Sequence, residues 1–459
     1  MSEDGLTQSI EKMRAEGLAD AAVDTFAHYY ERLRDGETGM LPEADIEPVA
    51  EVTDADDLPD GGGDALDRTV IVKLNGGLGT SMGMTRAKSL LEVKDGLSFL
   101  DVTVRQVLAL REERGARLPL VLMNSFATRD DTLSALEAYD DLEVDVPLDF
   151  VQGRVPKIRT DDLAPVEWPD NPRQEWTPPG HGDIYTSLVT SGTLRALLDA
   201  GYEYAFVSNS DNLGAVLDPR IVAWFAREQL PFAMEVTERT EADRKGGHLA
   251  RLKEGGRLVL RETAQTPDED LSQLQDIGRH RYVNTNNLWI DLRALQAKLD
   301  ESDGVLSLPM IVNRKTVDPG DKSTPEVFQL ETAMGAAIGV FDGAAALRVS
   351  RRRFAPVKTT EDLLGVRSDA YVLTDGFHVQ LAPEREGPPV IDLDADHFKL
   401  IADFDARFGS GPPSLLECER LEVSGDVAFG ADIVVRGTVK VAQEGESQLR
   451  VEDGAVLVG

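Results

Sequence analysis

The feature that most constrains the fold is a regular alternation, from Thr69 onward, of short apolar runs with stretches of helical periodicity. The apolar runs have strand length and are rich in β-branched or aromatic residues: Val70–Val72, Leu120–Met123, Tyr204–Val207, Phe232–Val236 and Leu288–Ile290. The helical stretches are Val102–Arg114, Leu133–Tyr139, Ile184–Leu198, Ile221–Glu228 and Val327–Phe341. This pattern predicts an α/β protein with a mostly parallel sheet covered by helices on both faces. Ligands of such sheets bind beyond the carboxyl ends of the strands.

The two ends of the chain follow other patterns. Apolar residues recur at roughly helical spacing over about the first 50 residues, and an acidic, glycine-rich stretch runs from Asp54 to Asp64. We interpret residues 1–66 as a helical lead with a flexible linker, 67–395 as the main domain and 396–459 as a C-terminal unit. That unit has a helical stretch near His397–Phe408, followed by short strands divided by glycines. It is either a small β-solenoid or a β-sheet appendage.

Charge and cysteine content exclude several classes of function. A formal net charge of −34 repels nucleic acid backbones and anionic membranes, so we expect neither as a partner. The longest apolar runs are strand-sized, well short of the ~20 residues of a membrane span, and the N-terminus lacks the pattern of a secretory signal. The single cysteine, Cys418, cannot form an internal disulfide. These features predict a cytoplasmic protein.

The segment from Val70 to Ser89 carries the clearest chemical signal. A strand runs directly into the glycine-rich sequence Asn-Gly-Gly-Leu-Gly-Thr-Ser-Met-Gly, and Lys88 follows it. Glycines let the backbone approach a ligand and direct N–H groups at phosphate oxygens, and a lysine can add a point charge. The sequence lacks the Gly-Lys-Ser/Thr of a P-loop, and the spacing of Gly77, Gly79 and Gly83 is one residue too long for the dinucleotide fingerprint.

The run from Lys73 to Gly83, with Lys88-Ser89 after it, resembles the eukaryote-type UTP–glucose-1-phosphate uridylyltransferases, also called UDP-glucose pyrophosphorylases. The resemblance extends over about residues 70–440. It includes Pro119–Phe126, Pro178–Tyr185, Val207–Gly214, Met234–Thr237 with Gly246-Gly247, Asn284–Trp289, Gln329–Ile338 and Pro356–Asp362. It implies a nucleotidyltransferase domain of Rossmann-like, GT-A-like type and a C-terminal β-helix.

The resemblance also implies roles for individual residues. Leu74, Asn75, Gly76 and Gly77 match the loop along the uridine and its phosphates, and Gln152 and Gly180 match uracil contacts. His181 matches a contact to the sugar phosphate, Asn209 a contact to both nucleotide and sugar, and Glu262 and Asn286 contacts to sugar hydroxyls. Lys88 and Lys358 match catalytic phosphate-binding lysines, and Asp211 matches the ligand of the cofactor Mg²⁺.

The residues themselves support some of these roles. Asp211 follows the apolar strand Tyr204–Val207, where a parallel sheet presents its ligands. His181 stands between two glycines ahead of a helix, a setting that favours anions. Lysines number only 13 among 48 basic residues, so each one in such a context is informative. We interpret Arg351, Arg352 and Arg353 as a solvated basic patch and Trp289 as a core residue.

The implied reaction joins UTP to glucose 1-phosphate by in-line attack of the sugar phosphate on the α-phosphorus, without a covalent intermediate. The nucleophile is already an anion, so no general base is required, and positioning and charge neutralisation carry the catalysis. Two alternatives stay open: a uridylyltransferase for N-acetylglucosamine 1-phosphate or another hexose phosphate, and an inactive scaffold protein.

One departure from the family pattern concerns the nucleotide loop. The family commonly has Lys-Gly-Pro before the Lys-Ser pair, whereas this chain has Thr85-Arg86-Ala87. The charge is preserved at a shifted position, but proline no longer fixes the backbone. Longer family members also carry residues beyond the C-terminal unit that support large assemblies, so we expect a monomer or homodimer here.

Overall fold

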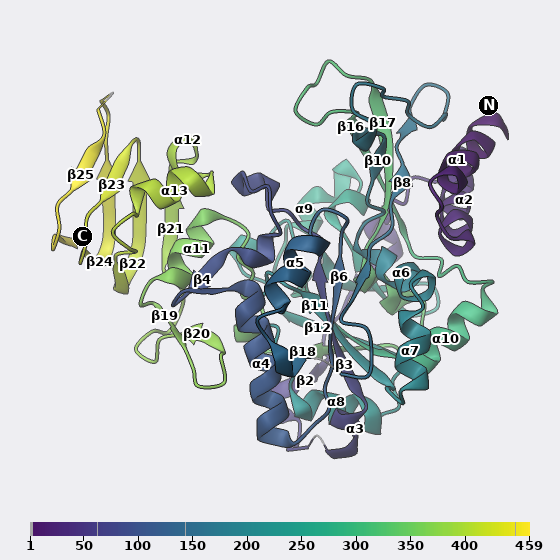
Figure 1. Cartoon of the computed structure of the whole chain (residues 1–459), viewed down its shortest axis with the longest axis horizontal. Coiled ribbons are helices and arrows are strands. Elements are labelled where there is room, and N and C mark those ends of the chain that lie inside the picture. The colour runs from purple at the N-terminus through teal and green to yellow at the C-terminus, as the bar shows by residue number, and fades with distance from the viewer. Residues whose placement is uncertain (1–2, 62, 143, 446) are drawn as a thin grey trace.

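The computed structural model describes residues 3–61, 63–142, 144–445 and 447–459; Gly62, in the predicted linker, lies outside them. Its centre is a mixed sheet, most of whose neighbouring strands are parallel (Figure 1). The order across the sheet is β2 (Thr53–Asp54), β18 (Ala345–Arg348), β12 (Phe232–Glu238), β15 (Tyr282–Asp291), β11 (Tyr204–Asn209), β3 (Thr69–Asn75), β6 (Leu120–Asn124) and β7 (Asp149–Val151). Along this order β15 alone runs antiparallel to both neighbours. The prediction of a mostly parallel α/β sheet is confirmed.

Helices cover both faces of this sheet, as the continuous apolar strands predict. In β3, Val70 and Val72 belong to one hydrophobic cluster and Ile71 to another, because successive side chains point to opposite faces. The first cluster includes residues of α6 (Ile184–Thr190), α7 (Thr193–Asp199) and α10 (Leu292–Glu301). The second includes residues of α3 (Gly63–Asp67), α4 (Phe99–Arg114), α5 (Arg129–Leu136) and α8 (Pro219–Arg227).

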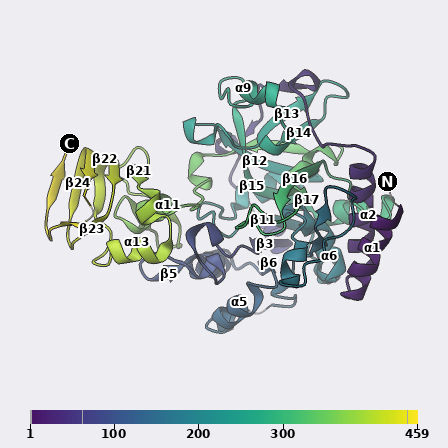
Figure 2. The same ribbon diagram turned by 90° about the horizontal axis from the view of Figure 1, so that it is seen from above.

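The predicted helical lead forms α1 (Glu3–Ala15) and α2 (Asp20–Arg34), which lie together at one side of the sheet (Figures 1 and 2). Their buried residues Met13, Phe26 and Tyr30 pack with Ile158 and Met310. The surrounding strands are β8 (Val155–Pro156), β9 (Ile158–Arg159), β10 (Trp176–Thr177), β16 (Met310–Thr316) and β17 (Glu326–Thr332).

The predicted helix Val327–Phe341 is wrong. The structure has strand β17 there, followed by the 3₁₀ helix η11 (Met334–Gly339). β17 pairs with β16 along its whole length and with β9. This long-range pairing satisfies the backbone and overrides a local periodicity that cannot by itself separate helix from strand. The predicted helix Ile184–Leu198 is divided into two helices in the structure. Gly192, which has a φ of +75°, is the N-cap of the second helix.

The segment before the main sheet also contributes strands to it. β1 (Ile46–Pro48) pairs with β13 (His248–Leu252), which pairs in turn with β14 (Leu258–Arg261), and β2 lies at the sheet edge. The acidic stretch from Asp54 thus contains the last residue of β2, the 3₁₀ helix η2 (Ala55–Asp57) and the start of α3, and is not only a loop.

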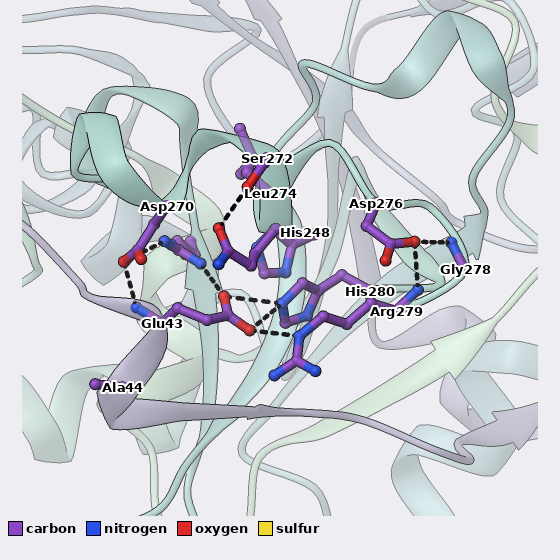
Figure 3. Close-up of polar contacts among 12 residues, drawn as sticks. Glu43, Ala44, His248, Asp270, Ser272, Leu274, Asp276, Gly278, Arg279 and His280 are labelled. Carbon is purple, nitrogen blue, oxygen red and sulfur yellow. Dashed lines mark hydrogen bonds and ion pairs between the residues drawn. The ribbon is translucent and has the colours of Figure 1, made fainter.

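A buried polar cluster fastens this segment to the rest (Figure 3). The Glu43 carboxylate accepts hydrogen bonds from Arg261 Nη1 at 2.5 Å, Arg279 Nε at 2.7 Å and His280 Nε2 at 3.0 Å. The His248 and His280 rings lie 3.9 Å apart, and neither is exposed to solvent. The short helix α9 (Leu271–Leu274) lies before His280 in the segment that connects β14 to β15.

The C-terminal unit stands apart from the main sheet in Figure 1, and its strands, joined by the strand Val390–Leu393 from just before the unit, form two parallel sheets. The larger has the order β21 (Val390–Leu393), β22 (Ser414–Ser424), β24 (Val434–Ala442) and β26 (Val456–Val458); the smaller pairs β23 (Val427–Phe429) with β25 (Leu449–Val451). Helices α11 (Thr360–Arg367), α12 (Ala395–Phe398) and α13 (Ile401–Arg407) and strands β4 (Glu92–Lys94), β5 (Leu97–Ser98), β19 (Tyr371–Leu373) and β20 (Val379–Leu381) lie between the two parts. In the described residues no helix has both the length and the apolar character that crossing a bilayer requires.

The stacked histidines make stability depend on pH. Burial lowers the pKa of His248 and of His280, although Glu43 partly opposes the shift at His280. In the unfolded chain both titrate near pH 6.5, so the unfolded state binds more protons below that pH. We expect stability to be fully present above about pH 6.5 and to fall, by up to about 1.4 kcal/mol per pH unit for each histidine, as the pH drops toward 5.

Urea unfolding at pH 7.5, 6.0 and 5.0 measures this dependence. The variant His248→Phe keeps an aromatic ring against His280 but cannot take up a proton, so its stability should fall less steeply by the equivalent of one proton. Equal slopes for wild type and variant would show that His248 does not set the pH response.

Candidate active site

The candidate catalytic charges lie at the ends of two neighbouring parallel strands. β3 and β11 pair in parallel with Leu74 opposite Asn209, so the segments after both strands leave the same edge of the sheet. The glycine-rich loop follows β3 and returns at the 3₁₀ helix η4 (Lys88–Leu90). Lys88 Nζ lies 2.7 Å from Asp211 Oδ2, and both side chains are partly exposed. Two residues 123 positions apart in sequence thus form one charged pair.

One glycine of the glycine-rich loop, Gly77, is not explained by the fold. A Cβ atom on Gly77 would meet no atom within 4 Å, and the residue has no left-handed φ. The fold itself therefore does not require glycine at 77, whereas close approach of a ligand to the backbone would. Gly79, by contrast, has a φ of +66° and begins the short helix η3 (Thr80–Met82).

The predicted uracil contacts are also brought together. Gln152 Nε2 donates to the Gly180 carbonyl at 3.0 Å, and a Cβ on Gly76 would lie 3.0 Å from Gln152 Oε1. Asn75 differs from the rest of this group. Its side chain is buried and donates to Asn124 at 2.8 Å, so it anchors the loop and is not available to a ligand.

His181 begins the 3₁₀ helix η7 (His181–Asp183), after Gly180 with a φ of +78°. Its Nδ1 accepts the Met334 backbone N–H at 3.0 Å, which leaves Nε2 as the protonated, donating nitrogen. Burial lowers the pKa of His181 to about 4, so the ring is neutral near pH 7. His181 can therefore bind an anion as a hydrogen-bond donor and not as a cation.

Lys358, Glu262 and Asn286 complete the candidate site. Burial raises the pKa of Glu262, and the nearby charge of Lys358 opposes that shift. Lys358 is exposed, and its neighbour Val357 donates a backbone hydrogen bond to the Asp211 carbonyl at 3.0 Å. Asn286, inside β15, has a φ of +58°, which is rare for a non-glycine residue and is common at binding sites.

Two ion pairs outside the predicted set of site residues escaped the sequence analysis. The interpretation of residues 351–353 as a solvated patch is wrong for two of them: Arg351 pairs with Asp243 at 2.6 Å, and Arg353 pairs with the buried Glu235 at 2.6 Å. The buried carboxylate arises from β12 and is far away in sequence, so no local signal reveals the pair. Trp289 is fully buried, as predicted.

Lys73 and Asp183 are two further buried charges beside the site. Lys73 Nζ donates to the Ala215 carbonyl at 2.7 Å, and burial lowers its pKa to about 7. Asp183 Oδ2 accepts the Gly153 N–H at 2.7 Å, and burial raises its pKa to about 6. In the sequence, Lys73 is marked by its position in the strand before the glycines, and nothing marks Asp183. Arg86, in the departure from the family pattern, is largely exposed and lies 3.6 Å from Asp131.

The mixed sheet, with a glycine-rich loop and a lysine–aspartate pair beyond the carboxyl ends of two parallel strands, is consistent with the nucleotidyltransferase-like class of α/β proteins. The family model described as UTP–glucose-1-phosphate uridylyltransferase matches residues 23–436. The chain belongs to this family.

Known proteins are similar to this chain in sequence and structure over most of its length. A curated UTP–glucose-1-phosphate uridylyltransferase from Solanum tuberosum is 46% identical over 85% of this chain and 80% of its own length. The enzyme of that name from Saccharomyces cerevisiae is 41% identical over 85% and 77%. Among solved structures, the UDP-glucose pyrophosphorylase of Leishmania major matches with a TM-score of 0.93 and 46% identity, covering 100% of this chain and 99% of that one.

The unusual backbone of Asn286 gives a testable difference between two substitutions. Asn286→Ala and Asn286→Gly both remove the side chain that accepts from Asn284 Nδ2 at 2.8 Å, but only alanine keeps a Cβ in the left-handed region. We expect the alanine variant to be less stable than the glycine variant by about 1 kcal/mol in urea unfolding.

Arg281, just before β15, serves as the matched control because its φ is not positive. There the order should reverse, with alanine more stable than glycine. Equal stability of the two Asn286 variants would argue against the left-handed backbone.

Proposed function

We propose that this protein transfers the uridylyl group of UTP to glucose 1-phosphate, giving UDP-glucose and pyrophosphate. The observation that carries the proposal is the contact of Lys88 with Asp211 beside a loop glycine that the fold does not need. Family membership supports the substrates, since relatives bear the name of this reaction and one Leishmania major structure is described as a complex with UDP-glucose.

We assign the nucleotide to the loop side of the site. The backbone of Leu74, Asn75, Gly76 and Gly77 is assigned to the uridine and its phosphates, because N–H groups of a glycine-rich loop can bind phosphate oxygens. Gln152 reads the uracil edge, and its bond to the Gly180 carbonyl holds its amide in one orientation. The uracil contacts are thus positioned before the nucleotide arrives, which reduces the entropy lost on binding.

The sugar phosphate is assigned to the opposite side. His181 donates its Nε2–H to the phosphate, and Asn209, Glu262 and Asn286 contact the sugar. Glu262 is a capping residue of the short helix η9 (Thr263–Gln265), and a Cβ on Gly247 would lie only 2.4 Å from its carboxylate. The glycine at 247 thus makes room for Glu262, and the cap fixes its backbone.

Magnesium is the proposed cofactor, and the residues present fit it as an ion carried by the nucleotide. No cluster of three or more His, Cys, Asp or Glu suited to a metal occurs among the described residues, and Asp211 is the carboxylate at the ligand edge. Mg²⁺ typically takes one or two carboxylates and completes its shell with phosphate and water oxygens. When bound, it would neutralise charge on the phosphates.

In the proposed reaction, an oxygen of the sugar phosphate forms a bond to the α-phosphorus of UTP. The bond from that phosphorus to the bridging oxygen breaks, and pyrophosphate leaves with the electron pair. Lys88 and Lys358 bind the phosphates and stabilise the charge that develops, and the neutral His181 orients the nucleophile. The anionic nucleophile needs no general base.

The remaining assignments are also proposals. We divide the chain into the lead 1–66, the catalytic domain 67–395 and the C-terminal unit 396–459. Successive strands from β22 to β26 alternate between two parallel sheets, which supports a short β-helix.

The cysteine Cys418 is buried and unpaired, which fits a reducing cytoplasm. We propose a monomer or homodimer as the working form.

Asp211→Asn tests the metal assignment. The side chain is partly exposed, so the fold should remain intact, while loss of a direct ligand should lower turnover about 10²-fold or more and raise the Mg²⁺ concentration needed for half-maximal rate. The exposed Asp199, which pairs with Arg195, provides the control variant Asp199→Asn. Wild-type rates for Asp211→Asn at limiting Mg²⁺ would refute the assignment.

Substrate choice tests the proposed function itself. The purified protein should use glucose 1-phosphate at least about tenfold better in kcat/KM than N-acetylglucosamine 1-phosphate, at matched UTP and Mg²⁺. Tenfold requires only about 1.4 kcal/mol, which one clash or one unpaired polar group supplies. Preference for the acetamido sugar would reassign the substrate, and no pyrophosphate release with any sugar phosphate would favour an inactive scaffold.

A further inference from the structure

Glu235, on β12, is a carboxylate with no exposed surface directly behind the site. Its two oxygens accept hydrogen bonds from Arg353 Nε at 2.9 Å and Nη2 at 2.6 Å, from Asn287 Nδ2 at 2.9 Å and from Trp289 Nε1 at 3.0 Å. Burying a charge is costly unless it is paired and fully hydrogen-bonded, and this carboxylate meets both conditions. The geometry is bidentate, which fixes Arg353 in orientation as well as in place.

The backbone of Arg353 connects the ion pair to the loop that carries Asp211. Its carbonyl accepts Asn212 Nδ2 at 3.1 Å, and Asn212 Oδ1 in turn accepts the N–H groups of Ala355 at 2.9 Å and Gly214 at 3.1 Å. Asn212 also forms an isolated bridge with Pro356. The segment that leads to Lys358 is therefore fastened to the loop that presents Asp211.

The two segments are in close backbone contact at Gly214. A Cβ on Gly214 would lie 2.3 Å from the Arg352 carbonyl oxygen and 2.8 Å from the carbonyl carbon of Arg353. Backbone against backbone offers no flexible side chain that could yield. A shift of the Arg353 segment therefore shifts the Asp211 loop.

Glu235 also holds both neighbours of Asn286. Its backbone carbonyl accepts Thr285 Oγ1 at 2.8 Å, and its carboxylate accepts Asn287 Nδ2. Asn286 itself, between them, has the left-handed backbone described above. A strained conformation persists only where its surroundings over-determine it, and Glu235 supplies contacts on either side.

We propose that Glu235 and Arg353 are positioning residues, whose buried ion pair sets the relative placement of Asp211, Lys358 and Asn286 without touching the substrates. The proposal rests on the proposed function, because it concerns the placement of groups assigned to that reaction. Misplacement by about 1 Å can cost on the order of 10² in rate, so the pair acts on catalysis beyond its part in holding the core together.

The test compares conservative variants by kcat, by KM for each substrate and by urea unfolding. Glu235→Gln keeps the shape of the side chain but removes its charge, and Arg353→Lys keeps the charge but loses the bidentate contact. We expect each to lower kcat about 10- to 100-fold, with KM values changed less than about threefold. Arg351→Lys is the matched control, because Arg351 lies in the same short helix η12 (Arg351–Arg353) and pairs with Asp243. It should retain wild-type kcat to within about twofold.

The double variant Glu235→Gln/Arg353→Lys adds a readout that a merely structural role would not give. If the two residues act through one interaction, the kcat of the double variant should be no lower than the kcat of the less active single variant. Should Glu235→Gln fail to fold, Arg353→Lys and its control carry the test. Folded variants with wild-type kcat, or equal loss in Arg351→Lys, would overturn the proposal. A wild-type protein inactive with UTP and glucose 1-phosphate would instead overturn the proposed function.

Discussion

The parallel pairing of β3 with β11 is the constraint on which the site depends. Because the two strands run side by side in the same direction, the chain leaves both at one edge, and that edge receives the glycine-rich loop and Asp211 together. Apolar side chains on both faces hold the register: Val70 and Val72 pack on one side and Ile71 on the other. A slip of one residue would exchange these faces, so the burial of the strands also fixes the position of the charges.

The net charge of −34 is a second constraint on the site. Its surface repels a nucleoside triphosphate, so the cations of the site must act locally. Lys88 forms an ion pair with Asp211, and Val357, the residue before Lys358, donates a backbone hydrogen bond to the Asp211 carbonyl. These contacts place the cations at the edge of the sheet and limit the freedom that a long side chain would lose on binding.

The sheet and the local motifs could be predicted from the sequence because their signals are local. Continuous apolar runs predicted β3, β6, β11 and β12, and the glycine-rich run after the first of them predicted the loop that contains Gly77. The failures came from contacts between distant segments. Residues 327–332 have a helical period but pair as β17 with β16, and the basic run at 351–353 hides Arg353, whose partner Glu235 lies 118 positions away. Neither partner is marked in the sequence near the residue that needs it.

The antiparallel strand β15 explains why the sugar side of the site takes a different form. A parallel strand delivers its last residues to the ligand edge, whereas β15 runs the other way and delivers its first ones. Its register against β11 sets Val207 opposite Leu288, and continued by two residues it sets Asn209 opposite Asn286. In the proposed assignment, loops after strands bind the phosphates, and a residue within a strand binds the sugar. A side chain inside a strand can be redirected only by altering the backbone itself, which accounts for the positive φ at Asn286 and for the dense hydrogen bonding of Glu235 to the residues on either side of it.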